Sequence, residues 1–102
     1  MSFQLIIRPE AEADVLEAFQ WYDEQIPGLG QEFLLELERA LESIQNNPEA
    51  NLRIHRDFRR VLTRRFPYST FYTVQGQSVV VIAVLHAARD PRLVRKRARN
   101  AR

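Results

Sequence analysis

The sequence of 102 residues, 45% hydrophobic and 27% charged, predicts one soluble globular domain and is too short for two independently packed cores. The absence of cysteine excludes disulfides and thiolate chemistry, and with His55 and His86 as the two histidines we expect no metal site and no cofactor. The longest apolar run, Val79 to Leu85, is far shorter than the roughly 20 residues that span a bilayer, and residues 1–7 lack the pattern of a signal peptide, so we expect a cytoplasmic protein without a membrane partner.

The charges are sorted along the chain, although the net charge is only +2. Residues 1–50 carry eleven acidic and two basic side chains, which gives a net charge of −9. Residues 51–102 carry thirteen basic and two acidic side chains, which gives a net charge of +11. Such an asymmetry between halves indicates an anionic partner. The alternative is that acidic helices lie against a basic sheet and neutralise it within the fold.

The first half of the sequence predicts a strand followed by two helices. Residues 3–7 are apolar and are followed by Pro9, which suits the first turn of a helix. Apolar residues then recur with a period near 3.6 in two stretches, 11–26 and 33–44. Because the intervening Pro27-Gly28 breaks the pattern over only a few residues, we expect the two helices to form an antiparallel hairpin.

The second half predicts four strands, which cover residues 53–55, 60–66, 68–74 and 79–85. A turn over the four residues between the last two strands makes them a hairpin. The last strand does not alternate between apolar and polar residues, so we expect it in the interior of the sheet, covered on both faces. Residues 89–102 are largely basic and predict either a short helix or a disordered tail.

Together these elements predict an α+β fold with the order β-α-α-β-β-β-β. The N-terminal strand joins a mainly antiparallel sheet of four to five strands, and the antiparallel helical hairpin packs on one face of it. We expect the second face to remain open. The expected organisation is a single domain over residues 1–91, followed by a basic tail over residues 92–102.

Three stretches stand out beside the order of the elements: PEAEAD at 9–14, RRFPYSTFYTV at 64–74 and VVVIAVLHAARDP at 79–91. In these features the chain resembles the RelE/ParE superfamily of toxins over nearly its whole length. The resemblance implies the toxin of a type II toxin-antitoxin system, neutralised by a cognate antitoxin whose C-terminal segment wraps it. It also implies one of two mechanisms: RelE-like members cut messenger RNA in the ribosome, whereas ParE-like members poison DNA gyrase by binding.

The residues favour the ParE-like mechanism. Metal-free RNA cleavage needs a base for the 2′-hydroxyl, cations for the phosphorane charge and an acid for the leaving oxygen. In RelE-like nucleases an arginine lies three residues before an aromatic residue on the penultimate strand, and with Tyr72 as that aromatic the position holds Ser69. Those nucleases also carry a tyrosine or a histidine–tyrosine pair after the last strand, where this chain has His86 alone. Together with these departures, the resemblance therefore implies ParE-like binding of gyrase, with a ribosome-dependent endoribonuclease, or a degenerate member that binds without toxicity, as alternatives.

His86 is the candidate catalytic residue of the nuclease alternative, because the pKa of an unperturbed imidazole suits a general acid or base. The simpler interpretation is that His86 closes the strand end by a hydrogen bond to a neighbouring carboxylate such as Asp90. His55 is interpreted as a turn residue or a phosphate contact. Tyr68 and Tyr72 fit the core as well as they fit a site.

The candidate target-binding residues are the cations of the mid-chain cluster and of the basic tail, since guanidinium groups bind phosphate and carboxylate bidentately. For the mid-chain arginines the alternative is a solvated strand face, and for the tail it is a role in solubility. The predicted residues are Arg59, Arg60, Arg64, Arg65, Arg89, Arg92, Arg95, Lys96 and Arg97.

Overall fold

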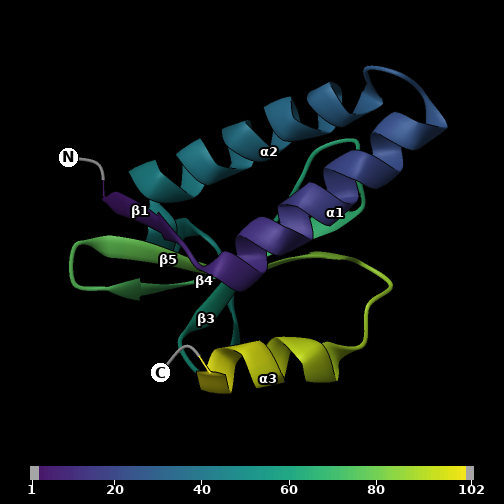
Figure 1. The fold of residues 1–102 in the computed structure, drawn as a ribbon. Coiled ribbons are helices and arrows are strands. Elements are labelled where there is room, and N and C mark those ends of the chain that lie inside the picture. Colours follow the sequence, from purple (N-terminus) through teal and green to yellow (C-terminus); the bar gives the residue numbers. More distant parts are fainter. Residues whose placement is uncertain (1–2, 101–102) are drawn as a thin grey trace.

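The computed structural model describes residues 3–100 and places one sheet between two layers of helix (Figure 1). The elements are, in chain order, β1 (Gln4–Ile7), α1 (Pro9–Gln25), α2 (Leu29–Asn46), the 3-10 turn η1 (Pro48–Ala50), β2 (Arg53–His55), β3 (Phe58–Leu62), β4 (Tyr68–Gln75), β5 (Ser78–His86) and α3 (Pro91–Asn100). The sheet order is β1-β5-β4-β3-β2, with β1 parallel to β5 and the other pairs antiparallel. The predicted α+β fold with a mainly antiparallel sheet is confirmed. Residues 1–2 and 101–102, which include the end of the expected tail, lie outside the described part of the chain.

The helical hairpin forms where the sequence predicts it. Pro9 occupies the first turn of α1, and Glu10 and Glu12 place negative charge at the positive end of the helix dipole. Between the helices Gly28 adopts a φ of 91°, a conformation that glycine reaches without steric cost. The Asp23 carboxylate accepts hydrogen bonds from the backbone N–H groups of Gly28 (3.0 Å) and Gly30 (3.1 Å), which fixes the turn. No helix of the described residues is both long enough and apolar enough to cross a membrane.

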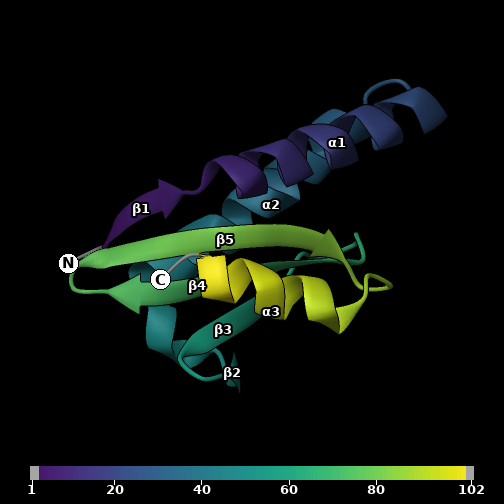
Figure 2. The ribbon, with the colours of Figure 1, turned by 60° about the horizontal axis from the view of Figure 1, so that its bottom comes forward.

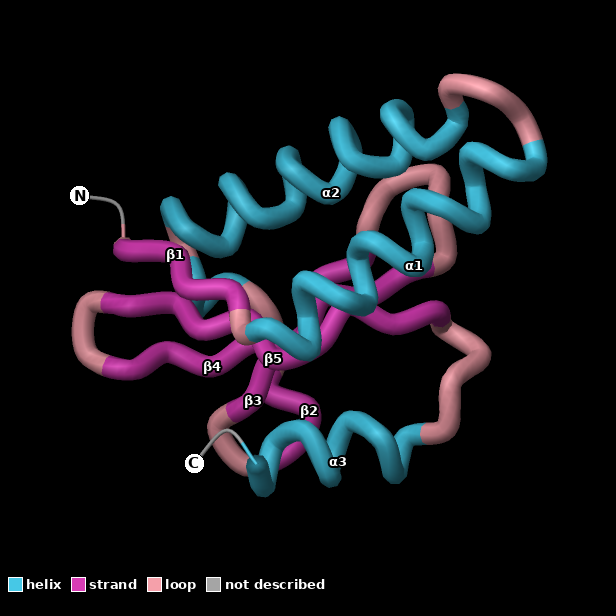
Figure 3. Tube along the Cα trace, viewed as in Figure 1, coloured by secondary structure: helices cyan, strands magenta, loops and turns pink. Residues whose placement is uncertain are grey.

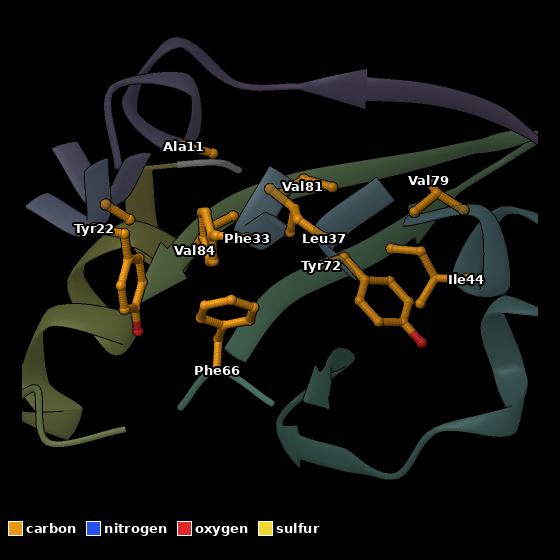
Figure 4. Packing of buried hydrophobic residues seen from close by; sticks show 11 residues of the cluster. Ala11, Tyr22, Phe33, Leu37, Ile44, Phe66, Tyr72, Val79, Val81 and Val84 are labelled. Carbon is orange, nitrogen blue, oxygen red and sulfur yellow. The ribbon is translucent and has the colours of Figure 1, made fainter. Parts of the chain in front are cut away.

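The main core lies between the hairpin and the sheet. Figure 4 shows Tyr22, Phe33 and Phe66 grouped toward one end of it, and Tyr72 and Ile44 toward the other. The Tyr22 ring lies 4.9 Å from the Phe66 ring and 5.4 Å from the Phe33 ring, between centroids. Aromatic pairs at this spacing stabilise a core beyond the area that they bury. The hairpin is thereby fixed on one face of the sheet.

Strand β5 is an interior strand covered on both faces, as the sequence predicts. Residues 79–85 are all buried. The pairing of β4 with β5 shifts between Phe71 and Tyr72, which leaves Ile82 as an extra residue opposite them. A second core, which includes Phe71 and Val94, lies on the other face of the sheet. Because of the bulge, Ile82 and Ala83 both face this second core, while Val84 faces the main core. Strand β5 therefore shows no alternation of apolar and polar residues because both of its faces are buried, and the bulge changes which residues face each core.

The expectation that the second face of the sheet remains open is wrong, because α3 covers part of it (Figure 2). Val94 and Ala98 lie one turn apart on α3 and are buried against the face that carries Phe71 and Ile82. Figure 3 shows helices on both sides of the strands. Of the two alternatives for the basic C-terminal segment, the structure has the helix.

Helix α3 is also held by an ion pair to α1. The guanidinium of Arg97 donates hydrogen bonds to both carboxylate oxygens of Asp14, at 2.9 Å and 3.0 Å. Arg97 also donates to the carbonyl oxygen of Ile82 at 3.0 Å, and Asp14 accepts from the backbone N–H of Val84 at 3.0 Å. The Arg97 and Asp14 side chains are only 16% and 12% exposed, so the pair is largely withdrawn from water.

The predicted strand over residues 60–66 has the wrong bounds, since β3 ends at Leu62. Arg65 adopts a φ of 71°, which no strand residue does, and the backbone N–H of Thr63 donates to the carbonyl of Tyr68 at 2.9 Å to close a loop. The alternation of the sequence continues past Leu62 because Phe66 is buried in the main core from this loop. The buried loop residue Phe66 therefore extends the apolar–polar alternation beyond the end of the strand.

Candidate functional site: a basic groove

A cavity of about 490 Å³ lies between α3 and the strands beside it. We call it the basic groove. Its walls combine apolar side chains with three arginines and two histidines, and its lining residues are Ile54, His55, Arg60, Leu62, Ser69, Phe71, Leu85, His86, Ala87, Arg89, Pro91, Val94 and Arg95. The groove lies on the second face of the sheet, the face opposite the helical hairpin, because α3 covers only part of that face.

Each cation of the groove comes from a different element. Arg60 lies on β3 opposite Phe71 of β4, Arg89 lies in the loop after β5, and Arg95 lies on α3. All three side chains are exposed, so they keep their charge at low cost. Folding therefore brings together, on one surface, cations that are up to 35 residues apart in sequence.

The groove continues toward the edge of the sheet. A neighbouring recess shares Ile54, Arg60 and Leu62 with it and adds Leu52. Leu52 is 85% exposed and Leu62 is 59% exposed, which leaves a row of uncovered apolar side chains beside Arg60. Apolar anchors next to cations suit a polypeptide segment that carries apolar and acidic residues.

Four of the nine predicted target-binding side chains make contacts within the fold. Arg59 donates to the backbone carbonyls of Glu49 and Asn51, and so holds the turn before β2. Arg65 pairs with Glu32 at 2.9 Å, Arg92 pairs with Asp90 at 2.6 Å, and Arg97 pairs with Asp14 at 2.9 Å. The pairs made by Arg65 and Arg97 join the basic half to the acidic half. For these two arginines, acidic residues of the helices therefore neutralise the positive charge within the fold, which is the alternative that the charge pattern left open.

The remaining five predicted cations divide between the groove and its surroundings. Arg60, Arg89 and Arg95 line the groove. Arg64 lies in the loop after β3 and Lys96 on α3, and both are exposed outside the lining residues. The groove thus selects three of the nine residues as the most favourably placed for a common ligand.

The simpler interpretation of His86, a hydrogen bond to Asp90, is wrong. Asp90 caps α3 by accepting from the backbone N–H of Arg92 at 2.9 Å, and hydrogen bonds from the Arg92 side chain hold the pKa of Asp90 below its usual value. His86 uses its Nδ1 to accept a hydrogen bond from the backbone N–H of Ala88 at 3.0 Å. In a neutral ring the proton then lies on Nε2, so the free edge of His86 presents a donor instead of a base.

The two tyrosines of β4 are poor acid–base candidates. Burial raises the pKa of Tyr72, whose hydroxyl donates to the carbonyl of Pro48 at 2.6 Å within the fold. Burial also raises the pKa of Tyr68, and the negative charge of Glu17 adds to the rise. Both phenols therefore stay protonated near neutral pH. Tyr72 is a core residue, and Tyr68 is half-buried with its ring edge-on to His86, 5.3 Å between centroids.

His55 and Ser69 are lining residues that the sequence did not place in a common site. His55 follows Ile54 at the end of β2, and three strand spacings, about 14 Å along the sheet, separate β2 from β5 with His86. Both histidines nevertheless line the basic groove, because this cavity extends across the strands from β2 to β5 beneath α3. Ser69 is buried at the floor of the groove. Among residues 3–100 no three potential metal-binding side chains gather in one place.

The comparisons with known proteins agree on the fold and on a class of toxins. The model of a family described as "ParE toxin of type II toxin-antitoxin system, parDE" matches residues 5–91. The chain is similar in structure to a chain of the chromosomal ParDE system from P. aeruginosa, with a TM-score of 0.74 and 18% identity, covering 83% of this chain and 96% of that one. No curated protein matches the sequence.

Two structures of the E. coli toxin RelE are also similar. A variant of RelE in the free state has a TM-score of 0.61 and 26% identity, and the alignment covers 86% of each chain. The isolated E. coli RelE toxin has a TM-score of 0.57 and 22% identity, with 96% of this chain and 98% of that chain covered.

Proposed function

Because the chain belongs to the ParE toxin family of type II toxin-antitoxin systems, we propose that it inhibits growth by binding DNA gyrase and that a cognate antitoxin neutralises it. The target site is the basic groove. The observation that carries the proposal is the composition of this groove, which supplies three cations and apolar anchors, while one of its two histidines uses its Nδ1 for a hydrogen bond with the backbone. A surface of this kind favours binding over catalysis. Since gyrase acts on the chromosome, we place the protein in the cytoplasm.

The alternative, a RelE-like ribosome-dependent endoribonuclease, has one observation in its favour. The groove contains both His55 and His86 together with three arginines, and these are the side chains from which a metal-free cleavage site is built. Against it stand Ser69 on the floor of the groove and the engaged Nδ1 of His86. A degenerate member that binds without toxicity is the third possibility.

Induced expression of the full chain without an antitoxin distinguishes these functions. We expect cell filamentation and a DNA-damage response while messenger RNA stays intact, and we expect His86→Ala to keep this toxicity. Microscopy, a DNA-damage reporter and primer-extension mapping of transcripts provide the readouts. Rapid codon-positioned cleavage of messenger RNA that disappears in His86→Ala would replace the gyrase proposal with the nuclease. Normal growth at every expression level would favour the degenerate member.

The groove itself is tested by reversing its charge. We expect Arg60→Glu combined with Arg95→Glu to weaken binding to purified gyrase about tenfold, a loss of about 1.4 kcal/mol. Both side chains are exposed, so the free energy of unfolding should change by less than about 0.5 kcal/mol per site. Arg64→Glu combined with Lys96→Glu is the matched comparison, since both side chains are exposed outside the groove and the net charge changes by the same amount. An equal loss in this comparison variant would show that the target surface extends beyond the groove, and unchanged binding in Arg60→Glu with Arg95→Glu would exclude the groove.

A further inference from the structure

A second recess, which we call the Trp21 pocket, lies on the hairpin side of the molecule. It has a volume of about 420 Å³ and is lined by Glu17, Trp21, Tyr22, Pro67, Tyr68 and His86. It shares only His86 with the basic groove. The proposed binding of gyrase at the groove makes no use of it.

The walls of the Trp21 pocket are aromatic. Trp21 is 54% exposed, whereas the neighbouring Tyr22 is buried, with 5.2 Å between the centroids of the two rings. Tyr68 is half-buried and lies 6.0 Å from Tyr22 between centroids. A large indole ring that remains open to water beside other rings offers apolar surface and a negative π face to a ligand.

The charge around Trp21 is negative. Glu17 lies four residues before Trp21 and Glu24 lies three residues after it, so α1 places one carboxylate a turn away on each side of the indole. Both side chains are exposed, and Glu17 lines the pocket directly. His86 closes the opposite side, and Arg89 lies next to it, where Arg89 and Glu17 line a small recess together with Tyr68 and His86. Among the described lining residues of the Trp21 pocket, Glu17 is the one acidic side chain.

An aromatic wall flanked by carboxylates matches one class of side chain, a planar cation. A guanidinium group stacks on aromatic faces and also donates a fork of hydrogen bonds to a carboxylate, whereas an ammonium group does only the second well. An acidic or neutral side chain would meet the charge of Glu17 without a counterpart. We propose that the Trp21 pocket receives an arginine side chain of the antitoxin; the identity of this partner rests on the proposed function.

The pocket can be tested on the full chain with short peptides, and Trp21 reports the result because it is the only tryptophan. The probe is a capped pentapeptide with one arginine between alanines, and its control has citrulline in place of arginine, which keeps the shape and removes the charge. We expect a saturable change in Trp21 fluorescence with the arginine peptide, and binding at least fivefold weaker with the citrulline peptide. Equal binding of both peptides, or binding of neither, would overturn the proposal.

Variants of the carboxylates separate the pocket from general attraction to an acidic helix. Glu17→Gln with Glu24→Gln should weaken binding of the arginine peptide at least fivefold. Glu38→Gln with Glu42→Gln, at exposed positions on α2, removes the same charge and should leave binding of the peptide unchanged. All four positions are exposed, so the variants should fold, and far-UV circular dichroism checks this. An equal loss of binding in the α2 variant would show that net charge alone explains the effect and would contradict the pocket.

The complex with the antitoxin encoded beside this gene distinguishes failure of this inference from failure of the proposed function. We expect Trp21→Leu, and separately Glu17→Gln, to weaken the complex at least fivefold relative to Glu38→Gln. Absence of any complex with the unmodified chain would contradict the toxin-antitoxin assignment and leave the peptide result to stand by itself. An antitoxin that binds the unmodified chain and the pocket variants equally well would overturn the inference alone.

Discussion

Replacement of Arg97 by leucine is expected to lower the free energy of unfolding by about 3–5 kcal/mol, the usual cost of removing one partner from a buried ion pair. The Asp14–Arg97 pair is held by two hydrogen bonds and is largely shielded from water. Without Arg97 the Asp14 carboxylate stays withdrawn from solvent and unpaired, and the carbonyl of Ile82 loses its donor. For a domain of this size, total stability is about 5–15 kcal/mol, so the change removes a large fraction of it.

The Asp14–Arg97 pair contributes this much to stability because its side chains take the place of a neighbouring strand beside the end of β5. β1 ends at Ile7, paired with Val81, whereas β5 continues to His86. Beyond Val81 the edge of β5 therefore has no backbone neighbour from β1. Arg97 donates to the carbonyl of Ile82, and Asp14 accepts from the N–H of Val84, as a neighbouring strand would. The two side chains thus satisfy a strand edge and fasten α3 to α1 at the same time.

Chemical and thermal unfolding measure this prediction. Arg99→Leu is the control, because Arg99 lies on the same helix, is exposed, and should change stability by less than about 0.5 kcal/mol. Asp14→Asn combined with Arg97→Leu should cost less than the sum of the two single changes, because the pair no longer leaves a charge behind. A loss below about 1 kcal/mol in Arg97→Leu, or strict additivity in the double variant, would show that the pair is weakly coupled.

Most of the fold could be predicted from the sequence, because the local signals for helices, strands and turns agree with the pattern of buried residues. Pro9 begins α1, Gly28 turns the hairpin, and the apolar periodicity of both helices faces the main core. The uninterrupted apolar run of β5 predicts an interior strand, and it is one. These elements are determined by sterics and by the pattern of apolar residues, which a sequence records directly.

The features that the sequence did not predict depend on contacts between distant residues. Helix α3 packs on the sheet with Val94 and Ala98 among many charges, and its anchor, Arg97, pairs with a residue 83 positions earlier. A run of basic residues with few apolar ones is typical of a solvated tail, and only the partner Asp14 shows that one of the arginines is structural. The expectation of an open face was wrong for this reason.

The sequence predicted the positive charge of the candidate site but not which arginines form it. The excess of positive charge in the second half indicates an anionic partner, and the structure gathers Arg60, Arg89 and Arg95 around one groove. Arg59 and Arg97, which the sequence treats as equal candidates, hold the fold instead. The sequence gives each arginine the same charge, whereas the structure decides which ones have an acidic or carbonyl partner within reach.

Replacement of Gly30 by alanine is expected to destabilise the protein by about 1–3 kcal/mol, the usual cost of overpacking a well-packed contact. Alanine favours a helix over glycine by about 1 kcal/mol, so at an open helical position the same change would stabilise. A Cβ atom at Gly30 would lie 2.8 Å from the ring of Phe19 and 2.8 Å from its backbone oxygen. The ring can rotate, but the backbone oxygen cannot move without shifting α1 against α2.

Two comparison variants make this prediction specific. Gly28→Ala has open space around the new atom but a φ of +91°, so its cost should be confined to backbone strain, about 1–2 kcal/mol. Ser43→Ala, at an exposed position of α2, should change stability by less than about 0.5 kcal/mol. Urea unfolding of the three variants separates steric contact, strain and propensity. A Gly30→Ala protein more stable than the unmodified chain would show that the hairpin can open to admit a methyl group, and that the α1–α2 contact does not fix the spacing of the helices.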